Sequence, residues 1–360
     1  TGQNNNVGQL AGIVAGPVTR NFLFKNNPVT TSALTIGTVN GINGINTVGG
    51  NGAISVTNDN GALTVNQVLN AGTGSVTLTA PASAITLNST VTSNGAGNAI
   101  VLASGSFVNN VGSAVFPGSA SFLIWSGNPA NDTRGGLVYN FKQYNAIYNS
   151  STVLGSGNGF LYTIAPTITS SLSGIISKTY DATNVATLTA GNFSSSGAID
   201  GDTVTLTNSG ATYGSVDVGN NINVAVTGIS IASATNGAAV VYGYQIGSTS
   251  ANANIGTITA APLTITANDI SKSYGQTVTF TGTEFTSSGL QGGQTIGSVN
   301  LTSSGAINTA DVAGSPYSIV ASNATGGTFN STNYTISYAP GNLTVTPAVL
   351  SYTADVVSTI

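Results

Sequence analysis

The sequence predicts an all-β protein: the end of a right-handed parallel β-solenoid followed by two tandem immunoglobulin-like β-sandwich modules. Three observations predict this fold. Short apolar pairs recur about every 22 residues in the first third of the chain. A longer pattern, which starts at the strand-like runs 163–182 and 257–276, recurs with a period of about 90 residues. Val, Ile, Thr and Tyr alternate with polar residues throughout, as is typical of strands.

The composition limits the possible functions. Charged residues make up only 4% of the chain, and the sequence has no Cys, Met or His. Nucleic acid is not an expected partner, because its phosphates require clustered basic residues, and the net charge is −4 with Lys and Arg scattered. No membrane span is expected either, because no apolar run approaches about 20 residues. The sequence starts at Thr1 without a signal-peptide pattern, so we expect any such leader to be removed or to lie outside it.

Residues 1–115 are predicted to form solenoid coils of about 22 residues each. Gly- and Asn-rich corners separate short apolar pairs, so each coil would place three short strands around a shared core. The pairs form three series: Leu34/Ile36, Ile54/Val56, Val76/Leu78 and Ile100/Leu102; Leu63/Val65 and Ile85/Leu87; and Val68 with Val91. An ordinary antiparallel sandwich with chance spacing is the alternative.

Residues 116–164 are predicted to cap the solenoid and join it to the next module. Large aromatic residues concentrate from Phe107 to Tyr162, and they would cover an open apolar column because each buries a large area. A strand is expected at 121–125, with turns at 128–129 and 134–136. The alternative is an aromatic face that binds carbohydrate.

Residues 165–260 and 261–348 are predicted to be two sandwiches, because about 90 residues with six or seven short strands fit an immunoglobulin-like module. No Cys…Trp…Cys framework is present. Tyr180 and Tyr274 are expected to be buried anchors near strand corners. Besides the opening runs, strands are expected at 186–189, 203–207, 222–226, 240–245, 256–259, 278–280, 298–301, 317–320, 334–338 and 343–345.

Two motifs resemble known bacterial modules. Residues 177–183 (SKTYDAT) resemble the start of the YDG module, with Ala182 where that motif usually has Gly. Residues 263–269 (LTITAND) and 272–275 (KSYG) resemble the MBG module, a bacterial immunoglobulin-like repeat. Residues 141–145 and 154–160 look like the segment that precedes such modules in filamentous-haemagglutinin-like adhesins.

The resemblance to these adhesins implies export by two-partner secretion and an extracellular location on the bacterial cell surface. It implies a role in cell adhesion or biofilm contact, and no catalytic residues. We therefore expect a non-enzymatic structural shaft of a large secreted or surface-anchored adhesin. The expected partner is an unidentified host or neighbouring-cell surface or glycan.

Two other function classes stay open. Little charge protects the strand edges, so the chain could be a subunit of a self-assembling extracellular filament, joined by strand addition. It could also be a secreted β-helix protein that binds or cleaves polysaccharide.

Candidate sites for chemistry are few. Without His and Cys, the usual zinc ligand sets and Ser-His-Asp or Cys-His catalysis are excluded. Asp200 and Asp202 form the closest carboxylate pair; we interpret them as a polar turn before a strand, with a calcium or acid/base role as the alternative. Residues 58–61 (NDNG) lack the acidic repeats of a calcium loop. We predict no catalytic residue, cofactor site or metal site.

An isopeptide cross-link requires a buried Lys beside a carboxylic acid or amide. Lys178 and Lys272 recur at equivalent positions of the two modules. Glu284 is the only Glu, and it has no counterpart in the first module. The pattern therefore gives this hypothesis little support.

Residues 349–360 repeat the opening strand of the preceding module. Leu350, Tyr352, Ala354 and Val356 alternate with other residues, so one face would need burial. We expect a strand at 350–356 packed on a module, either as the first strand of a further module or as a strand exchanged with another chain.

Overall fold

The computed structural model describes residues 5–353, which form an all-β protein with four short 3-10 turns. Contacts divide the chain into two compact units. Unit 1 comprises the described residues up to Ser171 together with Phe193–Asn208 and Gly228–Thr249. Unit 2 comprises Leu172–Asn192, Ser209–Thr227 and the described residues from Ser250. Within 5–353, no helix has the length and apolar character to cross a membrane.

Most of the strands belong to unit 1. They are β1 (Gln9–Leu10), β2 (Gly12–Ile13), β3 (Phe22–Asn26), β4 (Leu34–Ile36), β5 (Thr38–Val39), β6 (Ile42–Asn43), β7 (Ile45–Asn46), β8 (Ile54–Asn58), β9 (Leu63–Val65), β10 (Leu69–Asn70), β11 (Val76–Leu87), β12 (Val91–Thr92), β13 (Ile100–Asn109), β14 (Phe122–Ser126), β15 (Phe141–Gln143), β16 (Gly159–Tyr162), β17 (Thr167–Leu172, whose last residue falls in unit 2), β19 (Phe193–Ser196), β20 (Thr203–Thr207), β23 (Ser230–Asn236), β24 (Ala239–Tyr242) and β25 (Gln245–Ile246).

The remaining strands lie in unit 2. They are β18 (Ile176–Thr179), β21 (Gly210–Tyr213), β22 (Gly219–Thr227), β26 (Ser250–Thr259), β27 (Ala261–Ala267), β28 (Ile270–Ser273), β29 (Phe285–Ser288), β30 (Ile296–Thr302), β31 (Tyr317–Gly327), β32 (Tyr334–Ala339) and β33 (Gly341–Thr346). The 3-10 turns are η1 (Pro129–Asn131), η2 (Ala190–Asn192), η3 (Ser304–Ala306) and η4 (Ser331–Asn333).

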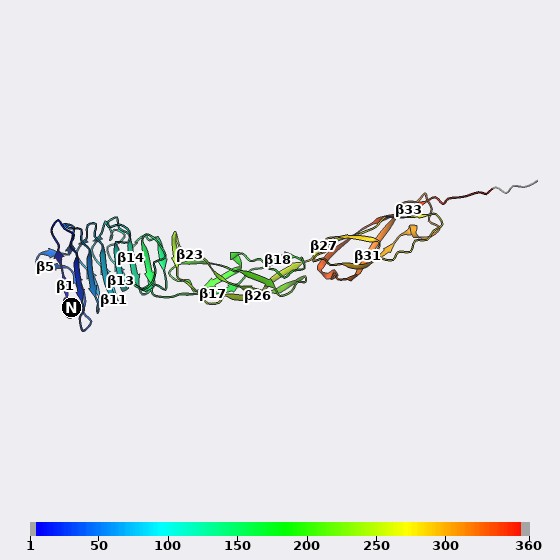
Figure 1. Cartoon of the computed structure of the whole chain (residues 1–360). Helices are drawn as coiled ribbons and strands as arrows, with labels where there is room; N and C mark the ends of the chain where they lie inside the picture. The colour runs from blue at the N-terminus through cyan, green and yellow to red at the C-terminus, as the bar shows by residue number, and fades with distance from the viewer. Residues whose placement is uncertain (1–4, 354–360) are drawn as a thin grey trace, which may run out of the picture. The chain divides into compact units, whose positions relative to one another are not determined.

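Parallel pairing organises the first part of unit 1, where successive passes of the chain lie side by side (Figure 1). One stack pairs β3, β8, β11, β13 and β14 through Phe22, Ile54, Val76, Ile100 and Phe122. Because partners occupy the same register from pass to pass, buried side chains fall on buried side chains, and the apolar core runs without interruption along the stack.

Two further parallel stacks complete each pass. The second runs through β4, β9, β11 and β13, with Leu34, Leu63, Ile85 and Phe107 in register. The third runs through β2, β7, β10 and β12. The antiparallel alternative is therefore wrong for this part of the chain, because its long-range pairing is parallel.

The predicted grouping of the apolar pairs needs two corrections. Leu34 and Ile36 pair with Leu63 and Val65, so they belong to the second stack and not to the first. The small antiparallel pair β5–β6 lengthens that pass, which made the sequence spacing misleading. Val68 is 47% exposed; its neighbour Leu69 is buried and pairs with Val91.

Asparagine side chains continue the stacking outside the apolar core. Asn110 donates a hydrogen bond to Asn88 (2.7 Å), and Asn88 donates one to Asn66 (2.8 Å), each across 22 residues of sequence. Buried Asn26 donates to Asn58 (3.0 Å) in the same way. Such amide ladders require in-register parallel strands, because only that arrangement places identical side chains one above another.

The sheet does not end at the last of these passes. β14 pairs with β16, β16 with β15, and β15 with β24, all in parallel. β24, β23 and β20 then form an antiparallel meander. The predicted strand at 121–125 is confirmed by β14. One hydrophobic cluster reaches from Leu34 to Ala234 and Val241, so segments 193–208 and 228–249 of the predicted 165–260 module belong to unit 1.

Unit 2 contains mixed four-stranded and three-stranded sheets. β18 pairs with β26 and β28 pairs with β33, both in parallel, at equivalent places in the two repeats. The expected strands 186–189 and 278–280 are wrong. Val185 forms only an isolated bridge with Thr212, and Val278 donates a single backbone hydrogen bond, to Ala306. Strand-forming composition alone does not make a strand where the pairing stops at a single bridge or a single hydrogen bond.

The two repeat tyrosines are not equivalent. Tyr180 is buried; its ring packs edge-on against Tyr334, and its hydroxyl accepts a hydrogen bond from Gln294 (2.8 Å). Tyr274 is 50% exposed, so its predicted role as a buried anchor is wrong. It stands next to Gly275, whose positive φ turns the chain there.

The expected strand near the end of the sequence is not formed in the part that the structure describes. Residues 347–353 adopt no strand, and the side chains of Val349, Leu350 and Tyr352 are exposed. The prediction that residues 350–353 pack on a module is therefore wrong for this single chain. Residues 354–356 of that prediction lie outside the described range.

Replacement of Leu78 by Ala should destabilise unit 1 by about 2–5 kcal/mol, because it opens a cavity between Val56 and Leu102 on the neighbouring passes. Denaturant unfolding followed by the fluorescence of Trp125, the single Trp, measures this change. Thr79→Ala on the outer face of the same strand is the control, with an expected change on the order of 0.5 kcal/mol. Equal losses in the two variants would contradict a core that depends on in-register stacking.

Candidate functional site

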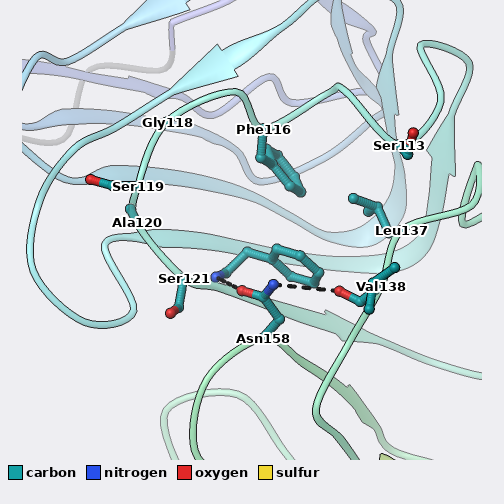
Figure 2. Close-up of a pocket in the computed structure, with 10 residues that line it drawn as sticks. Ser113, Phe116, Gly118, Ser119, Ala120, Ser121, Leu137, Val138 and Asn158 are labelled. Carbon is teal, nitrogen blue, oxygen red and sulfur yellow. Dashed lines mark hydrogen bonds between the residues drawn. The ribbon is translucent and has the colours of Figure 1, made fainter.

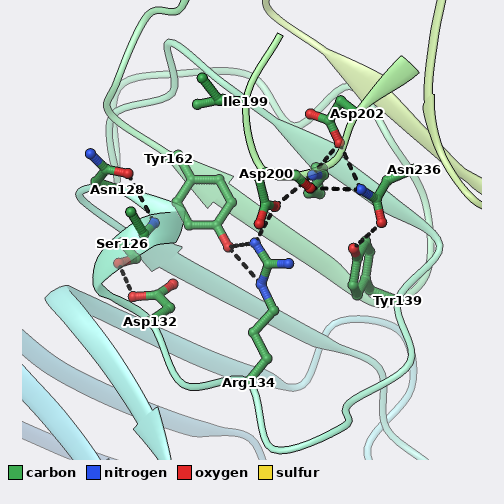
Figure 3. Close-up of polar contacts among 12 residues, drawn as sticks. Ser126, Asn128, Asp132, Arg134, Tyr139, Tyr162, Ile199, Asp200, Asp202 and Asn236 are labelled. Atoms are coloured by element: carbon green, nitrogen blue, oxygen red, sulfur yellow. Dashed lines mark hydrogen bonds and ion pairs between the residues drawn. The ribbon is translucent and has the colours of Figure 1, made fainter.

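A cluster of four charged side chains lies within unit 1. Figure 3 labels three of them, Arg134, Asp200 and Asp202. We call Arg134, Lys142, Asp200 and Asp202 the ionic cluster. The cations come from the aromatic segment before β17, and the carboxylates come from the turn before β20. In a chain with only 4% charged residues, four charged side chains in mutual contact are a distinctive feature.

Local turns position the two cations. Asn128 caps η1 by accepting a hydrogen bond from the Ala130 amide (3.0 Å), as expected for the predicted turn at 128–129. The chain then turns at 134–136, where Gly135 and Gly136 both have positive φ. Lys142 is the central residue of β15, which pairs with β16 on one side and β24 on the other, and its side chain is fully buried.

The turn before β20 positions the two carboxylates. Asp200 adopts a left-handed conformation (φ 57°), and the Asp202 amide donates to the carbonyl of Ile199 (3.1 Å). The interpretation of these residues as a polar turn before a strand is confirmed. Gly201 separates the two aspartates, and both side chains face the cations.

Each cation is held by direct ion pairs. Lys142 Nζ lies 2.6 Å from Asp200 Oδ2 and also contacts Asp202 Oδ1. Arg134 Nη2 lies 2.5 Å from the same Asp200 oxygen. Two positive and two negative charges therefore balance within the cluster. Removing charges from water is costly, so this arrangement is stable only when the remaining polar atoms are also satisfied.

Hydroxyl and amide groups satisfy the carboxylate of Asp202. Tyr144 and Tyr244 donate hydrogen bonds to Oδ2 at 2.7 and 2.9 Å. Asn236 donates to Oδ1 at 2.9 Å, and its own amide oxygen accepts a hydrogen bond from Tyr139 (2.8 Å). Asp202 is thus surrounded by donors while its side chain has no exposure to solvent.

The pKa shifts follow from this environment. Burial alone would raise the pKa of Asp200, but its hydrogen bonds and ion pairs with Arg134 and Lys142 outweigh burial and lower it. Burial raises the pKa of Tyr244 to about 12; its hydrogen bond from the Ile199 amide opposes the shift, and the neighbouring Asp202 adds to it. Burial first and Asp202 second also raise the pKa of Tyr144. Both phenols therefore remain protonated donors.

Aromatic rings enclose the guanidinium of Arg134. It lies over Phe160, Tyr139 and Tyr162 at 5.1, 5.5 and 5.7 Å from the ring centroids. Its Nε and Nη2 donate to the Tyr162 hydroxyl at 3.1 and 2.8 Å. A planar cation favours such ring faces, and the rings limit the access of water to its ion pair with Asp200, whose two side chains are 19% and 21% exposed.

The large aromatic residues between Phe107 and Tyr162 pack mainly against one another and not outward. Phe107, Phe141, Phe160 and Tyr162 have at most 1% exposure. The broad aromatic binding face considered from the sequence is therefore not displayed by these rings.

A separate pocket of about 310 Å³ lies in unit 1 beside Phe116 and Phe122 (Figure 2). Asn158 closes one side: its Oδ1 accepts a hydrogen bond from the Phe122 amide (3.1 Å), and its Nδ2 donates to the Val138 carbonyl (3.4 Å). The pocket is lined by aromatic, aliphatic, hydroxyl and amide groups without a charged side chain. Its lining includes none of the ionic cluster.

The site residues suggested by the sequence fall in different surroundings. Lys178 pairs with Asp181 (2.7 Å), whose side chain is 47% exposed. Lys272 is buried, but its ammonium group donates to the backbone carbonyls of Gln276 and Ile307. Glu284 binds the amides of residues 281–283. The recurring lysines therefore do not share one arrangement with a carboxylate.

The cations of the ionic cluster were missed because they were counted among scattered basic residues. One signal was available: Lys142 stands in a short run (FKQY) between the aromatic residues Phe141 and Tyr144. Its partners come 58 and 60 positions later, and sequence spacing gives no indication of that contact. Within 5–353, no group of three or more His, Cys, Asp or Glu residues could hold a metal ion.

Replacement of Arg134 by Met should destabilise unit 1 by about 3 kcal/mol, near the low end for breaking a buried ion pair, because Asp200 keeps some solvent exposure. Trp125 fluorescence during denaturant unfolding measures the loss. Arg20→Met, at an exposed Arg, is the matched control and should change the stability by less than about 0.5 kcal/mol. If the two variants unfold alike, the cluster does not stabilise the unit.

Glu284 should make the stability of unit 2 depend on pH. Backbone hydrogen bonds, first from Thr281, lower its pKa from 4.5 to about 2. A lowered folded-state pKa contributes stability that is present above pH 4.5 and lost as the pH falls through 2. Glu284→Gln should remove this contribution, so wild type and variant should differ at pH 7 and converge near pH 2 in calorimetry. Parallel curves for the two proteins would contradict this.

Comparison with protein families identifies two parts of the chain. Residues 163–251 match the YDG domain, and residues 263–344 match the MBG domain (YGX type). Both matches agree with the resemblances found at 177–183 and 263–275, and both are consistent with adhesin-like modules. No curated protein and no solved structure matches the chain. The chain therefore contains a YDG-like segment followed by an MBG-like segment within an all-β fold.

Proposed function

We propose that this chain is a non-enzymatic structural shaft of a large secreted or surface-anchored bacterial adhesin, which holds an adhesive region away from the cell. The YDG and MBG matches fit a surface or adhesin-like protein. The low charge and the all-β composition fit an extracellular structural role.

The architecture that we propose is the end of a right-handed parallel β-solenoid over residues 1–115, a cap over 116–164, and two immunoglobulin-like modules. The three in-register parallel stacks and the 22-residue asparagine ladder support the solenoid. The buried aromatic rings near Phe160 and Tyr162 support the cap. The repeated strand pairing in unit 2 supports related modules.

One observation carries the proposal: a single sheet runs by direct pairing from β1 to β20. Tension applied to such a sheet is shared among many backbone hydrogen bonds and is not concentrated in one flexible linker. β24 is the connecting strand, because it pairs with β15 on one side and β23 on the other. We further propose export by two-partner secretion and attachment to an unidentified cell surface or glycan.

A filament joined by strand addition is a second candidate. The low share of charged residues, 4% of the chain, favours it, because little charge protects the strand edges against pairing with another chain. Electron microscopy of the purified chain separates the two candidates: regular fibres support assembly, and persistent single particles support a shaft.

Val240→Pro should weaken the mechanical resistance of unit 1. Proline has no amide hydrogen, so this variant loses the hydrogen bond from the Val240 amide to the Asn140 carbonyl (3.1 Å) that joins β24 to β15. Single-molecule pulling from both ends should reveal an additional unfolding step at lower force. Val240→Thr keeps the amide and should behave like wild type. Identical force traces for the Pro variant and wild type would show that tension does not pass through this strand pair.

A further inference from the structure

We propose that unit 1 forms an intramolecular isopeptide bond between the side chains of Lys142 and Asp202. The bond would join Nζ of the lysine in β15 to Cγ of the aspartate before β20. It goes beyond the proposed function, because a shaft does not require it. It also differs from the sequence hypothesis, which considered Lys178 and Lys272.

Burial distinguishes this pair from the other Lys–Asp pairs that the structure describes, including Lys142–Asp200, in which the aspartate side chain is 21% exposed. The side chains of Lys142 and Asp202 both have 0% exposure and are in direct contact. In the pair Lys25–Asp59 the two side chains are 66% and 29% exposed, and in Lys178–Asp181 they are 16% and 47% exposed. Only Lys142 and Asp202, among the described ion pairs, are both withheld from water.

Removal from water leaves the Lys142 amine in contact with the carboxylates of Asp200 and Asp202. Attack on the carboxyl carbon requires the free electron pair of Nζ, so a proton must first pass from Nζ to one of these carboxylate oxygens. Enclosure also keeps out bulk water, which would favour hydrolysis of the product.

The reaction balances without an oxidant or an external reactant. The ammonium of Lys142 carries three hydrogens. One stays on Nζ as the amide hydrogen, and two leave with Oδ1 of Asp202 as one water molecule. The Nζ–Cγ bond forms, the Cγ–Oδ1 bond breaks, and Oδ2 becomes the amide oxygen. The two opposite charges are both lost, so the total charge is unchanged.

The surrounding groups are placed to assist each part of this reaction. Tyr144 and Tyr244 donate to Oδ2, where negative charge develops during attack and where the amide oxygen remains. Asn236 donates to Oδ1, the oxygen that departs. Asp200 Oδ2 lies 2.6 Å from Nζ and can carry a proton from the amine to the departing oxygen. Arg134 holds Asp200 in that position.

Intact-mass spectrometry of the purified chain tests the proposal. Wild type should be lighter than its sequence by one water molecule. Lys142→Arg should have its full sequence mass, because Arg keeps the positive charge but does not condense. Lys178→Arg, at the partly exposed pair, should keep the water deficit. Asp202→Asn should lose ammonia in place of water and give the same covalent product as wild type.

A tryptic digest locates the bond. Trypsin cleaves after the basic residues, so an unlinked chain gives peptides 135–142, 143–178 and 179–272. The isopeptide bond blocks cleavage after Lys142 and gives one branched product, 135–178 joined to 179–272. This map also excludes a cyclic imide at Asp200–Gly201, which loses the same water but leaves Lys142 cleavable and persists in Lys142→Arg.

Asp200→Asn tests the proton carrier. It should retain both reacting groups but accumulate chain of full sequence mass, and circular dichroism checks that it is folded. A folded wild-type chain of full sequence mass after prolonged incubation would overturn the proposal. A branched peptide linked through Asp200 would overturn the assignment of Asp202 as the acyl partner.

Discussion

A stack of in-register parallel strands exposes an apolar interior and an unpaired strand edge wherever it stops, and this constraint shapes the rest of unit 1. After β14, the chain adds β16, β15 and β24 to the same sheet and fills the interior with aromatic rings. β24, β23 and β20 then continue the sheet as an antiparallel meander. The end of the stack is therefore covered by segments that come much later in the sequence.

The ionic cluster fixes the position of the late segments on the end of the stack. Apolar packing alone would permit the late segments to shift, whereas Lys142 and Arg134 require Asp200 and Asp202 in one arrangement. A buried charge without its partner is costly, so a shifted register would be strongly disfavoured. The hydrogen bonds to Asp202 also require one placement of these segments. Its two oxygens accept from Tyr144, Tyr244 and Asn236, which lie in three different segments. We infer that the cluster specifies where the late segments sit, and that apolar burial supplies most of the stability.

The sequence predicted the features that repeat locally and missed those that depend on distant contacts. The apolar pairs at Ile54, Val76 and Ile100 fall in register because their period is regular. Leu34 was assigned to the wrong stack because the β5–β6 pair interrupts that period. Tyr274 was expected to be buried like Tyr180. A short motif determines the local course of the chain, but it does not determine which distant residues pack against the tyrosine ring. The charged residues of the cluster are isolated in sequence, so only the fold brings them together.

The two units are built from segments that alternate along the chain, and this limits how a gene segment that encodes part of the chain can be transferred to another protein. The chain passes from one unit to the other after Ser171, Asn192, Asn208, Thr227 and Thr249, and the YDG match at 163–251 contains all five crossings. A gene segment cut at the borders of that match would carry Asp200 and Asp202 without their cations. It would arrive in a new host protein with buried charge to compensate and no strand equivalent to β15. The segment that must be transferred as one piece is therefore longer than the YDG match, and it begins before Arg134.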